Sequence, residues 1–132
     1  SAVLNLMWAG IGRYIERYNI SYLFGCGSIH NINPYIVSSV YSFFWKNYMA
    51  DVRFKVTPLK KVPDFDPELT NYDKGMITKH VPQLLFAYLR LGARICGEPA
   101  FDEQFGVSDF LIILDRSKLI ERYKKHYMPC ML

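Results

Sequence analysis

The hydrophobic pattern of the first half of the chain predicts a helix, a strand and a second helix. Residues 3–18 place apolar side chains three and four positions apart, as an amphipathic helix does. Residues 22–29 are aromatic, branched and uncharged, which is typical of a strand. Asn33 and Pro34 form a favourable helix start, and the apolar positions of 36–48 continue that helix.

The second half alternates in the same way. Apolar and basic residues alternate over 52–56, which predicts a half-exposed strand, and three prolines make 57–79 an irregular excursion. A helix over 82–91, ended by Gly92, and a short strand over 93–96 follow. The remaining segments are predicted as a polar loop, a buried strand and a last helix, over 97–108, 110–114 and 117–127. We therefore expect an α/β layered domain, a small mixed sheet with about four helices packed on it.

Composition and charge fit one globular domain over residues 1–132. Hydrophobic residues are 51% and charged residues 21% of the 132, which excludes a disordered chain. The net charge of +4 permits an acidic partner without requiring one. The stretch between Arg17 and Lys46 has no charged side chain, but glycines, asparagines and Pro34 interrupt it. A buried strand and helix explain it better than a membrane-spanning helix.

Most catalytic and cofactor motifs are missing. The three cysteines, Cys26, Cys96 and Cys130, are far apart, so free thiols are expected and a metal site is not. The chain has no dinucleotide or phosphate loop, no nucleophile elbow and no H-E-x-x-H sequence. A nucleophile–base pair of Cys26 and His30 is disfavoured, because two residues four apart on a strand lie too far apart to share a hydrogen bond.

Three segments carry a family resemblance. They are LMWAGIGRY, YLFGCGSI and PQLLFAYLRLGARICGEPAFD, at 6–14, 22–29 and 82–102. In this order they resemble the conserved blocks of the hemolysin-like N-acyltransferases of the GNAT superfamily, which are related to ornithine- and glycine-lipid acyltransferases. The family's N-terminal half, with its E-L-G-R strand, has no counterpart here. The chain therefore resembles the C-terminal half of such an enzyme, and we expect it to be part of a longer protein and inactive alone.

The resemblance implies a partial GNAT-like fold and transfer of a fatty acyl group from an acyl carrier protein thioester to the amine of an amino acid, in lipid biosynthesis. It implies no bound cofactor, since the acyl carrier protein is the donor. The acyl-pantetheine is expected along the strand residues Phe24, Gly25, Cys26 and Gly27. A cytoplasmic location is expected, with peripheral attachment to the inner membrane face as an alternative.

Candidate catalytic residues follow from the same resemblance. Tyr41, on the helix after that strand, is the expected acid for the leaving thiolate, with Tyr35 as second choice. The alternative for Tyr41 is simple packing in an aromatic core. His30, at the end of the strand, is a candidate base, or else a hydrogen-bonding residue of the following turn.

Charged residues in the third segment are candidates for binding the substrate. Glu98, Asp102 and Asp109 would hold the amine, or else structure their loop through Asx turns. Arg90 and Arg94 would pair with these carboxylates or grip a substrate carboxylate. The last helix is basic. Its charged face is either an ordinary solvated surface or a binding surface for an acidic carrier protein or anionic lipid. The cations of this face are Lys118, Arg122, Lys124 and Lys125.

Two other functions compete with the enzyme. A non-catalytic module that binds a membrane or carrier protein agrees with the hemolysin name that such families carry. Nucleic-acid binding is weaker, because basic and aromatic residues are not interleaved in one patch. If strands are missing, the uncharged strand 22–29 becomes an open edge, so we expect a homodimer formed through it.

Overall fold

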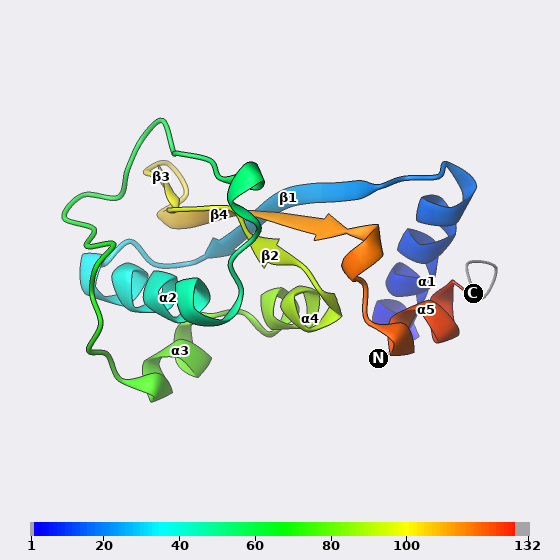
Figure 1. Ribbon diagram of the computed structural model, residues 1–132. Helices are drawn as coiled ribbons and strands as arrows, with labels where there is room; N and C mark the ends of the chain where they lie inside the picture. The colour runs from blue at the N-terminus through cyan, green and yellow to red at the C-terminus, as the bar shows by residue number, and fades with distance from the viewer. Residues whose placement is uncertain (1, 129–132) are drawn as a thin grey trace.

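The computed structural model describes residues 2–128 and contains helices on one face of a small sheet (Figure 1). The elements in chain order are α1 Ala2–Arg17, β1 Tyr22–Ile29, α2 Pro34–Asn47, the short 3-10 helix η1 Val52–Phe54, α3 Lys74–His80, α4 Gln83–Leu91, β2 Arg94–Ile95, β3 Ala100–Asp102, β4 Val107–Asp115, the 3-10 helix η2 Arg116–Lys118 and α5 Glu121–Tyr127. The α/β class expected from the sequence is confirmed.

The sheet is organised around β4. β1 lies antiparallel on one side of β4, with Tyr22 opposite Asp115, while β2 and β3 both pair with its other side. All three ladders are antiparallel rather than the mixed sheet that we expected, and parallel pairing is limited to isolated bridges such as Val56 with Gly97. Within the described residues β1 has no second strand neighbour, so its outer edge is open.

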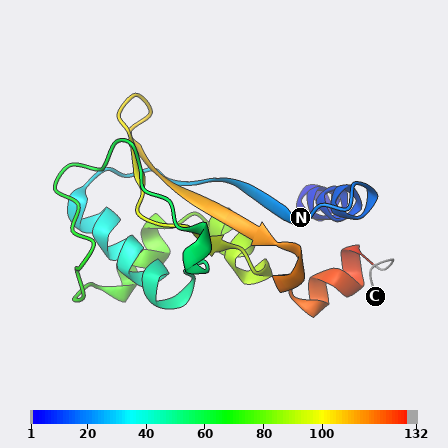
Figure 2. The ribbon, with the colours of Figure 1, turned by 45° about the horizontal axis from the view of Figure 1, so that its top comes forward.

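Two hydrophobic clusters hold the layers together. In the larger one, α2, α3 and α4 cover one face of the sheet, where the buried rings of Phe44 and Phe110 meet edge to face with centroids 5.1 Å apart. In the smaller one, α1 and α5 pack together at one end of the sheet (Figures 1 and 2). There the Tyr123 hydroxyl donates a 2.8 Å hydrogen bond to the carbonyl of Trp8.

Three segments differ from their sequence-based predictions. The strand predicted over 52–56 is wrong: Asp51 accepts a hydrogen bond from the Arg53 amide and starts η1 instead. The excursion over 57–79 is irregular except at its end, where α3 begins after the N-cap Asp73. The loop predicted over 97–108 contains β3, because the chain folds back on β4 as a short hairpin.

The strand β1 is uncharged but is not the buried strand that we expected. Its first half is open to solvent, and Phe24 is 77% exposed. Only Gly27 and Ile29 are buried in it. The lack of charge therefore marks an exposed edge rather than a central position in the sheet. No helix among residues 2–128 has the length and apolar character needed to cross a bilayer.

Candidate functional site

A groove on the outer side of α2 brings together two residues that the sequence singled out. It is lined by Tyr41 and Trp45 of α2, by the segment 67–72 and by Glu98 of the β2–β3 connection, and it has a volume of about 970 Å³. We call it the Tyr41 groove. Tyr41 is the predicted acid and Glu98 a predicted amine ligand, and they are 57 positions apart in the sequence.

Two hydroxyl groups on α2, one of them in the lining of this groove, anchor the segment that forms its other side. Ser38 and Ser42 lie one turn apart on the helix, so they point to the same side. The Ser38 hydroxyl accepts a 2.8 Å hydrogen bond from the Asp66 amide, and the Ser42 hydroxyl donates to the Leu69 carbonyl. The two bonds hold part of the irregular excursion against α2 and give the groove a fixed side.

Tyr41 is buried but keeps its phenol free. Its ring lies 5.3 Å from that of Phe65, and 94% of the residue is shielded from solvent. Burial, and to a smaller degree the Glu98 carboxylate, raises the pKa of Tyr41 above its ordinary value of 10.0. Its hydroxyl makes no hydrogen bond to any residue in 2–128, so it is available as a proton donor to a bound molecule.

Glu98 is held where β2 leaves the sheet. The preceding Gly97 bridges to Val56, and a methyl group at Gly97 would lie 2.3 Å from the Val56 carbonyl oxygen. Lys61 lies 4.0 Å from the Glu98 carboxylate, whose side chain is 24% exposed. Close backbone packing thus fixes the residue that carries the carboxylate, and one cation faces it.

The predicted pairing of arginines with the carboxylates of the third segment is wrong within the described residues. Arg94 donates to the carbonyls of Leu89 and Ala93 and lies over the ring of Tyr48 at 5.6 Å. Arg90 lies over Phe86 at 5.8 Å, on the exposed side of α4. Neither arginine forms an ion pair with Glu98, Asp102 or Asp109 within residues 2–128.

Asp102 and Asp109 have structural partners. The Asp102 carboxylate accepts a 3.0 Å hydrogen bond from the Phe105 amide three residues on, so it structures its own loop, although through a longer span than that of the expected Asx turn. The Asp109 carboxylate accepts a 2.5 Å hydrogen bond from the Ser28 hydroxyl across the β1–β4 ladder. Neither residue lines the Tyr41 groove, so their assignment to substrate binding stays a prediction.

The two other candidates near the strand end are also outside the groove. His30 is exposed directly after β1, and Tyr35 is exposed in the first turn of α2. Between them, Asn33 caps the helix by accepting from the amides of Tyr35 and Ile36. The role of His30 as a base stays a prediction, because the structure brings it to no groove that contains Tyr41.

The predicted acyl-pantetheine strand borders a separate apolar pocket of about 210 Å³. Phe24, Gly25 and Cys26 line it from β1, while Trp8 and Ile11 line it from α1. The fourth predicted residue, Gly27, instead faces Leu85 of α4. This pocket has no lining residue in common with the Tyr41 groove.

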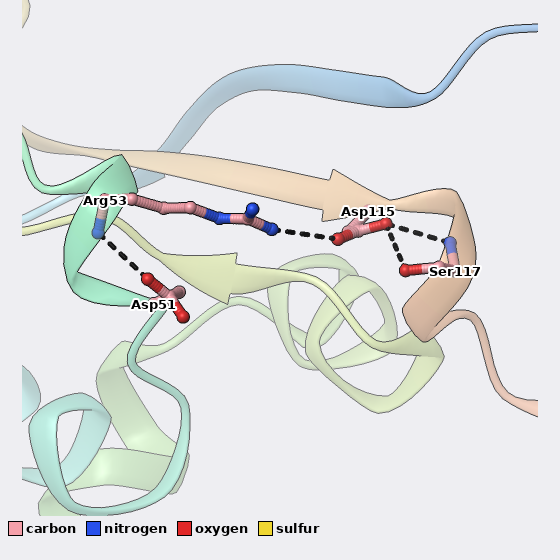
Figure 3. Close-up of polar contacts among 4 residues, drawn as sticks. All are labelled: Asp51, Arg53, Asp115 and Ser117. Atoms are coloured by element: carbon pink, nitrogen blue, oxygen red, sulfur yellow. Dashed lines mark hydrogen bonds and ion pairs between the residues drawn. The ribbon is translucent and has the colours of Figure 1, made fainter.

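A polar contact lies at the C-terminal end of β4, away from the β3–β4 hairpin (Figure 3). Arg53 of η1 lies 4.0 Å from the Asp115 carboxylate, which also accepts hydrogen bonds from the amide and hydroxyl of Ser117. Because Asp115 caps η2 through these bonds, the contact is structural. It ties the η1 segment to the end of the central strand.

Cysteine and metal chemistry receive no support from the described residues. Cys96 is buried, and burial raises the pKa of its thiol, which disfavours the reactive thiolate. Cys26 is an exposed free thiol on the strand edge, and Cys130 lies outside the described residues. Residues 2–128 contain no group of three or more His, Cys, Asp or Glu side chains arranged to hold a metal ion.

The sequence-based search missed the cationic part of the site. Lys46 and Lys74 line the Tyr41 groove together with Tyr72, although they belong to α2, α3 and the segment between. Lys46 ends the long charge-free stretch of the sequence, and this was the one available signal. Nothing in the local pattern of 72–74 indicates that it meets the end of α2.

Comparison with known proteins confirms the resemblance seen in the sequence. The chain is 32% identical over 127 residues to a protein of Brucella abortus (strain 2308) and 30% identical over 128 residues to one of Rhizobium meliloti (strain 1021). It is 27% identical over 128 residues to one of Agrobacterium fabrum. Each of these relatives is named "L-ornithine N(alpha)-acyltransferase".

The similarity extends over 94% of this chain but only 43–45% of each of these relatives, so the chain spans less than half of their length. No protein-family model matches the chain. No solved structure matches it either. An acyltransferase relationship is therefore supported across nearly all of the chain, while the larger part of the relatives has no counterpart in it.

Proposed function

We propose that this chain forms part of an N-acyltransferase that moves a fatty acyl group from an acyl carrier protein thioester to the α-amine of an amino acid. The similarity to proteins named for L-ornithine N(alpha)-acylation supports this reaction class. The observation that carries the proposal within the structure is Tyr41, a shielded but unbonded phenol with a raised pKa, in one groove with the Glu98 carboxylate.

The reaction needs one proton donor and one proton acceptor. The neutral amine attacks the thioester carbon, the C–N bond forms, and the C–S bond breaks. The departing sulfur takes the phenolic proton of Tyr41, and the surplus proton on nitrogen goes to water, from which Tyr41 is protonated again. A raised pKa suits this role, because it keeps the phenol protonated at neutral pH.

Glu98 is the proposed ligand of the amino acid's amine. Its carboxylate accepts hydrogen bonds from an ammonium or amine group placed beside Tyr41. Lys46 and Lys74 line the same groove and supply positive charge for the α-carboxylate of the amino acid. Charges of both signs in one groove match an amino acid, which itself carries both.

The donor side of the reaction involves α5 and β1. The proposal takes the acyl carrier protein to be acidic. Its surface would then meet the cations of α5, among them Arg122 and Lys125, which are exposed. The strand β1 would accept the pantetheine arm along its open edge. The absent part of the relatives' length would complete this side of the cleft.

An acyl-transfer assay tests the proposed function. Acyl carrier protein charged with a 3-hydroxy fatty acid is offered to the chain alone and to the chain with any residues that precede it in its gene, with L-ornithine or glycine as acceptor. We expect N-acylated product from the longer protein and little from the chain alone. If neither acylates an amine and the chain instead binds anionic liposomes, the non-catalytic module is the correct function.

A further inference from the structure

A second groove adjoins the Tyr41 groove and is mainly apolar. It lies between α2, α3, α4 and the start of α1, and it has a volume of about 1040 Å³. Phe43, Ile77, Leu84 and Phe86 contribute apolar side chains to it. We call it the Arg90 groove. Its volume is at the upper end of small-molecule sites, which are roughly 300–1,000 Å³.

The charges in this groove are all of one sign. Lys46, Lys74 and Arg90 line it, and no Asp or Glu does. None of the three cations forms an ion pair with a carboxylate within residues 2–128. Apolar walls with unpaired cations match a molecule that has a hydrocarbon chain and an anionic end.

The two grooves meet at shared residues. Lys46, Tyr72 and Lys74 line both of them. An anionic group held at these lysines therefore borders the Tyr41 groove on one side and the apolar walls on the other. The proposed reaction makes a molecule of this kind, because an amino acid acylated on its amine keeps its free carboxylate and gains a hydrocarbon chain.

We infer that the Arg90 groove binds the acyl chain of an N-acyl amino acid, with the product's carboxylate held at Lys46, Lys74 and Arg90. The inference rests on the proposed function and adds the place and the charge requirement of product binding. It assigns a role to the exposed cations of α2, α3 and α4, none of which has an ion-pair partner in the described structure.

Direct binding to the purified 132-residue chain tests the inference without needing catalysis. The probe is N-dodecanoylglycine, below its micelle concentration, measured by isothermal titration calorimetry. Its matched control is N-dodecanoylglycinamide, which has the same acyl chain but no carboxylate. We expect one molecule bound per chain, and about 10-fold weaker binding of the amide, since charge-assisted hydrogen bonds are lost.

Variants separate the two ends of the groove. Arg90→Gln and Lys74→Gln are expected to weaken the binding of N-dodecanoylglycine several-fold, while Lys79→Gln, at an exposed position of α3 that lines neither groove, leaves binding unchanged. Leu84→Glu places a carboxylate beside the hydrocarbon chain of the ligand and is expected to abolish its binding. Leu59→Glu is its control, because Leu59 is fully exposed and lines none of these grooves. Circular dichroism verifies that each variant is folded.

Three calorimetric results would each overturn the inference. They are equal binding of acid and amide, undiminished binding by both Arg90→Gln and Lys74→Gln, and no saturable binding of the acid at all. If Leu84→Glu changes the oligomeric state instead of ligand binding, the groove is a protein interface and the inference is also wrong. Acyl transfer that persists in such a case would leave the proposed function intact, so the two failures are distinguishable.

Discussion

The Ser28 hydroxyl donates a 2.5 Å hydrogen bond to the carboxylate of Asp109, its directly opposed partner in the β1–β4 ladder. The two residues are 81 positions apart in the sequence. The bond satisfies a carboxylate on a half-buried strand, and it fixes the register of the edge strand against the central one. It also occupies an oxygen of Asp109, a residue that the sequence marked as a substrate ligand.

Removal of this hydrogen bond is expected to destabilise the sheet. Ser28→Ala should lower the free energy of unfolding by about 1–3 kcal/mol, because the bonded acceptor is charged. Urea denaturation of Ser28→Ala, Asp109→Ala and the double variant measures the coupling between the two residues. Additive effects of the two single substitutions would show that the bond contributes nothing to stability.

Gly97 and Gly25 are expected to respond oppositely to alanine. A methyl group at Gly97 would collide with the Val56 carbonyl at 2.3 Å, whereas one at Gly25 meets nothing within 4 Å. Gly97→Ala should therefore destabilise the chain by about 2 kcal/mol or more through forced backbone movement, and Gly25→Ala should be nearly neutral. Thermal unfolding followed by circular dichroism measures both. Equal effects would contradict the close approach of Val56 and Gly97 on which the position of Glu98 depends.

Loss of the Tyr41 hydroxyl is expected to slow acyl transfer in the active, longer protein. Tyr41→Phe removes the proton donor but keeps the ring contact with Phe65, so kcat should fall by about 10²-fold or more with little change in stability. Tyr35→Phe is the matched control on the exposed first turn of α2. A normal kcat for Tyr41→Phe, or an equal loss for Tyr35→Phe, would remove Tyr41 from the mechanism.

Stability above pH 10 is expected to depend on Tyr123. Burial, with smaller contributions from Tyr127 and Tyr88, raises the pKa of Tyr123 from 10.0 to about 12. Between these values the folded chain retains a proton that the unfolded chain has lost, so ionisation favours the unfolded state and stability falls as the pH rises. The loss should reach roughly 2 kcal/mol by pH 12.

Tyr123→Phe isolates this effect. At pH 7 the variant should be less stable by about 1 kcal/mol, because the hydrogen bond to the Trp8 carbonyl is gone. The difference from the unsubstituted chain should narrow as the pH rises from 10 toward 12, as measured by urea denaturation at each pH. A constant difference over this range would contradict the raised pKa.

In the chain alone, without acyl carrier protein, the open edge of β1 is expected to bind a second copy of the chain. The strand has eight residues, no charge and no proline, so nothing in it opposes edge-to-edge pairing. Phe24→Lys should convert the predicted homodimer to a monomer in light scattering, because a charge then lies on the edge. Leu59→Lys, at a fully exposed position away from the edge, serves as control. A monodisperse monomer of the unsubstituted chain at high concentration would show that this expectation is wrong.

Local signals accounted for most of the elements but not for their exposure. The spacing of apolar residues in α1, the Asn33–Pro34 start of α2 and the Gly92 end of α4 all proved to be correct boundaries to within a few residues. The predicted strand over 52–56 failed because alternation of apolar and basic residues also fits a capped turn, and Asp51 supplied the cap. We expected β1 to be buried because it lacks charge. This failed because an uncharged strand also fits an open edge, and the local sequence does not distinguish the two positions.

The sequence by itself determined the class of the fold and the similarity to acyltransferases carried by three ordered segments, and it nominated Tyr41 and Glu98, which share a groove. These depend on local periodicity and on residue identity, which the sequence records directly. Only the tertiary structure decided which charges meet. It placed Lys46 and Lys74 in one groove, paired Asp109 with Ser28, and set Arg90 over the ring of Phe86, because partners far apart in the chain are selected by how the layers pack.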